Sequence, residues 1–409
     1  MNKSNLLIRN LVSKTNVAIF CAIGMVCTFL VSRAVLSCFV FVFGFNAIRD
    51  INPKNWKKDI WWIAGVIWFL MYALSFFWTM DVDNWHTRVE VKLPVLLLPL
   101  AFYFLPSFNR KQLQWFTVCS SLLLLGSVAY SLSFFVKDPA YYSEQYVYSH
   151  VLPTLVYGDH IRYSLFLALY IVWLASVFND LGAKWIKAFV VFTIVVLSAY
   201  LHILAARTGL IVWYIFVASW CLRFAFKKNL TMGIGIILVL VISSAMAVKY
   251  IPTLEKRVWY MRHTYELYTS GQATSSYSDM GRFISYSIAT KLITQNAIIG
   301  VGVGDILYEM NKGYDRWQPD VPQEYRLMPH NQFMIVCLGC GILALLVFVF
   351  WVFYPLTWIR KSPKGFYQFI IWISLFLAMM VEPMLEVQFG VFVYLFFLLW
   401  SKHTAVIEN

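Results

Sequence analysis

Long apolar runs separated by short polar connections recur along almost the whole chain. The runs are about 16 to 24 residues long, close to the roughly 20 residues that a helix needs to cross the hydrocarbon core of a bilayer. They lack the strict alternation of apolar and polar residues that marks the strands of a membrane barrel. The pattern therefore predicts an all-α integral membrane protein. The twelve runs interpreted as spanning helices are 16–32, 34–48, 60–78, 93–106, 113–136, 161–178, 186–204, 208–226, 230–250, 331–357, 367–381 and 386–401.

Composition supports the same class of protein. Of the 409 residues, 60% are hydrophobic and 13% are charged, which excludes a soluble domain that must cover itself with polar surface. The first apolar run lacks a small-x-small cleavage site, so we expect the N-terminus to be retained. All seven cysteines fall inside apolar runs, which argues against both a disulfide framework and a thiolate metal site.

The basic residues are distributed unevenly between the two sides of the predicted membrane. Alternate connections, together with both termini, hold 18 of the 33 Lys and Arg residues but only four of the 20 acidic residues. Because basic residues concentrate on the cytoplasmic side of membrane proteins, both termini are predicted to be cytoplasmic. The formal net charge of +13 is then a signal of topology, and it does not indicate a nucleic-acid partner.

The largest polar segment, 251–330, falls on the outer side between the ninth and tenth predicted spans. Within it, residues 282–295 place Ile284, Ile288 and Leu292 on one side at helical spacing. This pattern predicts an amphipathic helix on or near the membrane surface. No internal repeat or flexible linker divides the chain, so residues 1–409 are predicted to form one polytopic membrane domain with 251–330 as its outer lid.

Two arginines on the predicted outer side are candidates for binding phosphate. Arg207 lies where two long apolar runs meet with almost no loop between them, and Arg282 opens the amphipathic stretch. Arg207 can also be interpreted as an anchor that snorkels to the interface, and Arg282 as a solvated helix-start residue paired with Asp279. Guanidinium groups bind phosphate bidentately and keep their charge when partly desolvated. We therefore expect the two arginines to form a phosphate clamp.

His330 is the candidate general base. It follows Pro329, which disfavours helix before it, at the point where the long loop re-enters the membrane. A lone histidine at an interface is usually structural, but an imidazole can remove a proton near neutral pH. Asn331, the next residue, is placed to orient it.

The first outer loop carries a second cationic pair. Arg88 and Lys92 are four residues apart and would share one helix face, where both can contact phosphate. Asp81 and Asp83 resemble the Asp-x-Asp motif that binds metal in many sugar-nucleotide enzymes, but the motif is short and common. We interpret these two residues as solvated loop acids and predict no metal site.

In order and sidedness, these pieces resemble the O-antigen ligase family of bacterial envelope glycosyltransferases. The segments that carry the resemblance are 88–94 followed by Leu98-Pro99, 206–209 (ARTG), 281–283 (GRF) leading to 296–302, His330-Asn331 leading to 339–342 (GCGI), and the Glu-rich 382–390. The resemblance covers most of the chain. The middle of the long loop, 314–326, departs from it because it matches no family signature, which leaves the acceptor open.

The resemblance implies a GT-C-like fold in the bacterial inner membrane with a periplasmic active site. It also implies metal-independent transfer of a glycan from undecaprenyl pyrophosphate to a hydroxyl of lipid A–core, without a cofactor. By carry-over, Arg207 and Arg282 would bind the pyrophosphate and His330 would activate the acceptor hydroxyl. Arg88 and Lys92 would assist in holding the anionic lipid.

Three alternatives remain. An O-antigen polymerase and a protein O-oligosaccharyltransferase would use the same donor on the same fold. A lipid-oligosaccharide flippase or secondary transporter belongs to another class, whose members place ionisable residues in mid-membrane and show pseudo-symmetric halves. The concentration of charged residues in the outer loops favours surface chemistry over transport.

Overall fold

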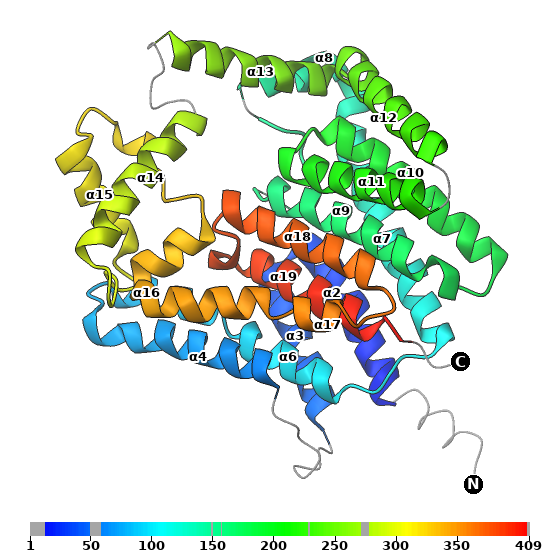
Figure 1. Cartoon of the computed structure of the whole chain (residues 1–409), viewed down its shortest axis with the longest axis horizontal. Helices are drawn as coiled ribbons and strands as arrows, with labels where there is room; N and C mark the ends of the chain where they lie inside the picture. The colour runs from blue at the N-terminus through cyan, green and yellow to red at the C-terminus, as the bar shows by residue number, and fades with distance from the viewer. Residues whose placement is uncertain are drawn as a thin grey trace.

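The computed structural model describes residues 13–49, 59–148, 150–156, 158–227, 230–270 and 278–406. These residues form helices, 3-10 turns and connecting loops, and none of them lies in a β-strand. The all-α prediction is therefore confirmed. The helices pack side by side as a bundle whose members run mostly in one direction and its reverse (Figure 1).

The twelve predicted spans all coincide with helices. In chain order these are α2 (Lys14–Val31), α3 (Arg33–Ile48), α4 (Ile60–Leu74), α6 (Pro94–Phe104), α7 (Arg110–Lys137), α9 (His160–Val177), α10 (Lys184–Leu204), α11 (Arg207–Lys227), α12 (Leu230–Tyr250), α16 (Gln332–Phe353), α18 (Gly365–Val381) and α19 (Gln388–His403). The helices between them are α5 (Val82–Glu90), α8 (Pro139–Gln145), α13 (Pro252–Thr269), α14 (Ser278–Gln295), α15 (Ile306–Trp317) and α17 (Leu356–Ile359).

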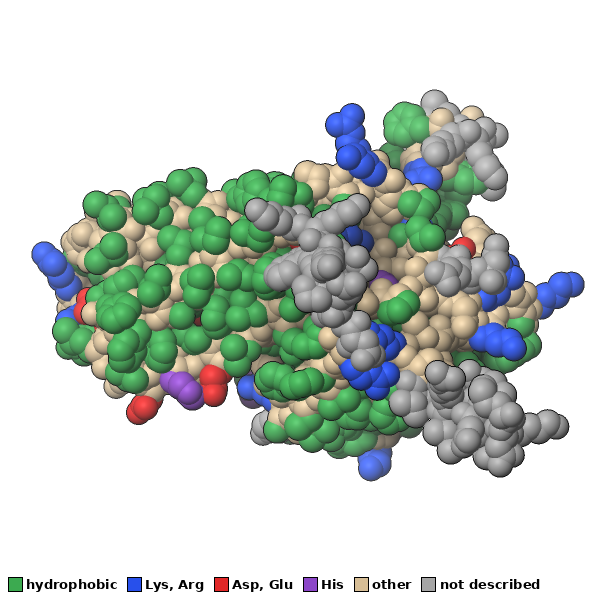
Figure 2. Space-filling model, turned by 90° about the horizontal axis from the view of Figure 1, so that it is seen from below, with side chains coloured by type: hydrophobic (Ala, Val, Ile, Leu, Met, Phe, Trp, Pro, Cys, Tyr) green, Lys and Arg blue, Asp and Glu red, His purple; other side chains and the backbone are tan. Residues whose placement is uncertain are grey.

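Not all of these helices are long enough to span a bilayer unaided. Within the described ranges, seven helical segments meet both the length and the hydropathy expected of a span, and α3 and α18 are apolar but shorter. The count of twelve spans therefore stays a prediction. Figure 2 shows hydrophobic side chains covering a broad part of one face, as expected of a surface that contacts lipid.

The core is centred on α9 and α19, whose residues are buried along nearly the whole length of each helix. Figure 1 shows α19 in the middle of the bundle, and it packs on α6, α9 and α18. Aromatic rings fill this core, and Trp400 of α19 stacks on Phe396 with a 5.4 Å separation of ring centroids. A site open to solvent is therefore expected at the ends of these helices.

The outer segment 251–330 contains α13, α14 and α15. The amphipathic helix is confirmed as α14, but its apolar face packs on α15 and α16, where Ile288 and Leu292 are buried. Figure 1 places α14 and α15 together at the end of the bundle where α16 begins. The basic residues at positions 3, 9, 54, 57, 58 and 228 that entered the topology prediction lie outside the described residues.

A glycine-rich loop docks this outer segment onto a break in α16. Gly341 has a φ of +77° inside α16, and the backbone around it bonds to the loop through Ile342 N to Ala297 O at 2.8 Å and Val301 N to Leu338 O at 2.8 Å. A Cβ added at Gly341 would lie 2.0 Å from the carbonyl oxygen of Ile298. The glycine therefore permits both the backbone conformation and the close approach.

We predict that Gly341→Ala destabilises the fold by at least about 2 kcal/mol, because a strained φ and a backbone clash act together. The measurement is the thermal unfolding midpoint of the purified protein in detergent. Gly126→Ala in α7 is the matched control, since nothing lies within 4 Å of its added Cβ. Equal midpoints for the two variants would contradict the prediction.

Candidate functional site

The short loop between α18 and α19 brings two glutamates to the end of the bundle at which α16 begins. Glu382 caps the C-terminus of α18, and Glu386 ends the 3-10 turn η6 (Met384–Glu386). The loop is held by Gln332, whose Oε1 accepts a 2.7 Å hydrogen bond from the backbone N–H of Leu385. Each glutamate becomes the centre of a separate cluster of cationic side chains.

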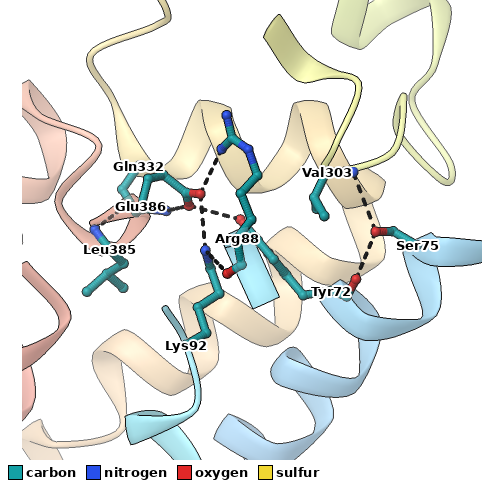
Figure 3. Close-up of polar contacts among 8 residues, drawn as sticks. All are labelled: Tyr72, Ser75, Arg88, Lys92, Val303, Gln332, Leu385 and Glu386. Atoms are coloured by element: carbon teal, nitrogen blue, oxygen red, sulfur yellow. Dashed lines mark hydrogen bonds and ion pairs between the residues drawn. The ribbon is translucent and has the colours of Figure 1, made fainter. Parts of the chain in front are cut away.

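Glu386 binds four side chains (Figure 3). Its Oε2 lies 2.9 Å from Nη1 of Arg88 and 3.1 Å from Nζ of Lys92. Its Oε1 accepts hydrogen bonds from Nε2 of Gln332 at 2.8 Å and from the hydroxyl of Tyr72 at 3.2 Å. These partners come from α4, the α5–α6 segment and α16, so one carboxylate joins three parts of the chain that are far apart in sequence.

The charged groups of this cluster are buried, so each of them needs an opposite charge close by. The Lys92 side chain is 0% exposed and that of Glu386 is 8% exposed. Burial raises the pKa of Glu386, but the charges of Lys92 and Arg88 and the hydrogen bonds from Gln332 and Lys92 outweigh it and lower the pKa to about 2. Glu386 is therefore ionised at neutral pH. With two cations around one carboxylate, the cluster keeps an excess of positive charge.

The structure gives Arg88 and Lys92 different positions in the site. Both reach the same carboxylate oxygen, as their four-residue spacing suggests. Lys92 also donates to the carbonyl of Arg88 at 3.3 Å, and its Nζ lies 4.3 Å from the centre of the Tyr72 ring. Since Lys92 is enclosed, it can position the cluster without touching a substrate. Arg88 is 17% exposed, and in Figure 3 its guanidinium extends beyond the carboxylate.

Glu382 joins two of the predicted catalytic residues. One of its oxygens lies 2.9 Å from Nη2 of Arg282, and the other lies 3.2 Å from Nδ1 of His330. Burial raises the pKa of Glu382, but the hydrogen bond from His330 and the charges of His330, Arg282 and Arg162 hold it below its usual value. The structure thus brings Arg282 and His330 together through a carboxylate.

The pairing assigns a tautomer to His330. An ionised carboxylate can only accept a hydrogen bond, so Nδ1 of the imidazole must carry the proton that it donates to Glu382. When the ring is neutral, Nε2 then holds a lone pair and can accept a proton from another group. The hydroxyl of Tyr286 donates to the backbone carbonyl of His330 at 2.9 Å, which fixes the backbone beneath the ring.

Asn331 acts on the backbone in this structure. Its Oδ1 caps α16 by accepting hydrogen bonds from the N–H groups of Phe333 at 2.9 Å and Met334 at 3.1 Å. Its amide donates to the carbonyl of Met380 at 3.1 Å. Asn331 therefore holds the start of α16 against the end of α18, the two helix ends that carry His330 and Glu382. Its predicted role in orienting the His330 ring stays a prediction.

Arg207 opens α11 and is half-buried. The next turn contains Gly209, where an added Cβ would lie 2.7 Å from the carbonyl oxygen of Ser164. This close approach sets the start of α11 against the first turns of α9. Arg162 lies in those turns, and its charge acts on Glu382. Arg207 and Arg162 therefore belong to the same end of the α9–α11 pair.

Three residues of this arrangement are absent from the predicted site. Glu382 and Glu386 stand in a short acidic connection between two apolar runs, and Arg162 opens another such run. An ionisable residue at the end of an apolar run was the available signal, because desolvation there requires a partner. The sequence could not say which partner each residue meets. The side chain of Asp279, the expected partner of Arg282, lies outside the described residues.

The first outer loop carries no metal cluster in the described part of the chain, where no group of three or more His, Cys, Asp or Glu residues converges. Asp81 caps α5, with Oδ1 accepting from the N–H of Asn84 at 3.0 Å. Asp305, which is buried, accepts hydrogen bonds from the N–H groups of Met80 and Asp81 at 2.8 Å each. These acids fix the first loop against α15.

The Glu386 cluster predicts a dependence of stability on pH. Because the pKa of Glu386 falls from a usual 4.5 to about 2 in the folded protein, its contribution is fully present above pH 4.5 and is lost as the pH falls toward 2. Glu386→Gln should remove this contribution and lower the free energy of unfolding at neutral pH by about 3–5 kcal/mol, since two buried cations lose their counter-charge.

Unfolding of the detergent-solubilised protein, followed from pH 7 to pH 2, measures both effects. Glu309→Gln is the control, because Glu309 forms an ion pair with the exposed Lys312 and should cost less than about 1 kcal/mol. An equal loss of unfolding free energy in the two variants would show that the Glu386 cluster does not stabilise the fold more than an exposed ion pair does.

Comparison with known proteins places part of this site in a family. A sequence model of the O-antigen ligase family matches residues 192–349, a segment that contains Arg207, Arg282 and His330. Arg88, Glu382 and Glu386 lie outside it. No curated protein sequence matches the chain. The members of this family are glycosyltransferase-like ligases and polymerases that act on lipid-linked glycans. The match over residues 192–349 supports the assignment of this multi-pass helical chain to the O-antigen ligase family.

Proposed function

We propose that the protein transfers O-antigen, or a similar surface glycan, from undecaprenyl pyrophosphate to lipid A–core at the periplasmic face of the bacterial inner membrane. The observation that carries the proposal is the Arg282–Glu382–His330 arrangement, in which one carboxylate holds a cation and a potential base. Glycosyl transfer requires both: a positive charge for the leaving pyrophosphate and an acceptor for one proton.

In the proposed reaction, the acceptor hydroxyl attacks the anomeric carbon of the lipid-linked glycan. Its proton passes to Nε2 of His330, while Nδ1–H of the same ring stays bonded to Glu382. The bond between the anomeric carbon and the phosphate oxygen breaks, and undecaprenyl pyrophosphate leaves with the electron pair. The negative charge that grows on the pyrophosphate is stabilised by Arg282 and Arg207.

Arg282 retains the capacity to bind an anion. Glu382 takes up Nη2 of the guanidinium, whereas Nε is buried and makes no hydrogen bond to the described residues. A buried donor without an acceptor is costly and is uncommon outside functional sites. A phosphate oxygen of the donor would satisfy Nε. The exposed part of the Arg88 guanidinium offers a further contact, with Lys92 and Glu386 as its positioning residues.

A groove of about 310 Å³ beside the Glu386 cluster suits the lipid part of the donor. It lies between α3, α6 and α19, and Val91 and Leu93 in its wall flank Lys92. Most of its lining is aliphatic or aromatic, with Ser37, Glu90 and Gln388 as the polar members. One isoprenoid segment can lie along such a wall while the pyrophosphate reaches the cationic clusters.

The proposal is tested by reconstitution with undecaprenyl-pyrophosphate glycan and lipid A–core in the presence of EDTA. His330→Ala and Arg207→Ala should each lower transfer by about 100-fold or more, because one loses the base and the other a stabilising charge. His150→Ala and Arg316→Ala, both exposed outer residues, are the matched controls and should retain full activity. Undiminished transfer by the His330 and Arg207 variants would contradict the roles assigned to these two residues.

The product identifies the acceptor class in the same experiment. Glycan attached to lipid A–core supports the ligase. Glycan attached only to protein would favour a protein O-oligosaccharyltransferase. A lengthening chain on undecaprenyl pyrophosphate would favour a polymerase. Movement of the donor across the bilayer without any transfer would favour a flippase.

Glu382→Gln tests the positioning of the base. A glutamine amide that donates to Nδ1 would favour the tautomer with a proton on Nε2, so kcat should fall by about 100-fold or more with KM for the acceptor little changed. A merely structural role would instead lower the thermal midpoint and leave kcat per folded molecule unaltered. The matched control is Glu324→Gln, which makes the same substitution at an exposed position of the long loop.

A further inference from the structure

A second hollow lies at the opposite end of α18 from the Glu382 site. Its volume is about 550 Å³, and it is formed by α11, α17 and the turn that begins α18. Since α18 runs 17 residues from Gly365 to Val381, the hollow is about 25 Å from Glu382 along the helix axis. The residues that line it are Arg223, Leu356, Ile359, Arg360, Ser362, Pro363, Gly365, Phe366 and Phe369.

The charge of this hollow is positive. Arg223 and Arg360 are both exposed, and neither forms an ion pair with a carboxylate in the described ranges. The guanidinium carbon of Arg223 lies 4.5 Å from the centre of the Phe366 ring, a contact that holds the side chain over the hollow. None of the described residues that line the hollow is acidic.

One other cation of this turn, Lys364, is already paired. Nζ of Lys364 lies 2.6 Å from Oδ2 of Asp180 and donates to the carbonyl of Thr404 at 2.7 Å. Asp180 is therefore already paired with Lys364. Arg223 and Arg360 remain as the cationic groups that face the hollow.

An apolar strip leads away from the hollow along α16 and α18. Phe369, Trp372 and Phe376 follow one face of α18, with ring centroids 5.8 Å and 5.7 Å apart in sequence order. Phe353 of α16 packs edge-on against Trp372 and Phe376 at 5.4 Å each. Phe369 and Phe353 are 44% and 39% exposed, whereas Trp372 between them is buried. The two phenylalanines therefore present the apolar surface of the strip to its surroundings.

We propose that this hollow binds the phosphate of an anionic phospholipid such as phosphatidylglycerol, with the acyl chains along the Phe353–Phe369–Trp372–Phe376 strip. Two arginines suit a phosphate diester, and basic hollows between membrane helices bind anionic headgroups. The lack of an acid in the lining disfavours a zwitterionic headgroup, whose ammonium would need a carboxylate. The apolar strip disfavours free phosphate. The site is independent of the proposed transfer reaction.

The test is a lipid titration of the purified full-length protein in detergent. Dioleoyl phosphatidylglycerol, dioleoyl phosphatidylcholine and inorganic phosphate are added separately, and binding is followed by native mass spectrometry and by the thermal unfolding midpoint. The variant is Arg223→Gln/Arg360→Gln. The matched control is Lys111→Gln/Lys184→Gln, which removes the same charge from exposed positions at the starts of α7 and α10.

Wild type and the lysine control should bind phosphatidylglycerol equally and in preference to phosphatidylcholine. The arginine variant should bind it about 25-fold more weakly, at about fivefold for each arginine. If the double variant does not fold, each single variant should show the fivefold loss.

Three results would overturn the proposal. One is equal affinity of the arginine variant and the lysine control for phosphatidylglycerol. Another is equal binding of phosphatidylcholine and phosphatidylglycerol by the wild type. The third is an equal shift of the midpoint with inorganic phosphate alone, which would indicate a free-anion site.

Discussion

The need to neutralise buried charge at one end of an apolar bundle governs the organisation of this protein. Lys92 has no exposure to water, and a desolvated ammonium persists only with a counter-charge close by. Glu386 supplies it, and in doing so it fixes the α18–α19 loop against α4, the α5–α6 segment and α16. The same loop carries Glu382 four residues earlier. The position of Glu382 is therefore set by the Glu386 ion cluster, which stabilises the loop that both residues share.

The two glutamates have different surroundings, and only Glu382 lies beside residues of the proposed reaction. Glu386 is enclosed and meets more positive than negative charge, so its ionised form is strongly favoured. Glu382 stands between Arg282 and His330, where ionisation determines which ring nitrogen carries the proton. In the proposed reaction, this carboxylate would hold the base on one side and the anion-binding guanidinium on the other, and so couple the two requirements of glycosyl transfer. The proposed function relies on this coupling more than on any single residue.

Backbone packing explains why short glycine-containing pieces accompany the charged ones. The loop at 296–302 bonds to Leu338, Gly339 and Ile342 around the break in α16, and Gly209 lets α11 approach α9 at Ser164. Gly390 plays a similar part, since an added Cβ would lie 1.7 Å from the carbonyl oxygen of Met384 in the glutamate loop. These glycines hold together the ends of α9, α11, α16 and α19, where the charged side chains meet.

The sequence by itself determined the helical class and the position of each apolar run, and it predicted Arg207, Arg282 and His330 as candidates, because hydrophobic period and the cost of charge near lipid are local properties. It also placed α14 and identified Arg88 and Lys92 as neighbours. Only the tertiary structure decided that Glu382 and Glu386 are the hubs, that Lys92 is enclosed, and that Asn331 caps a helix. The two glutamate clusters and the enclosure of Lys92 depend on contacts between segments that are distant in the chain, and burial, which no local pattern records, sets the strength of these contacts. The cap formed by Asn331 is local, but its amide also bonds to the distant Met380.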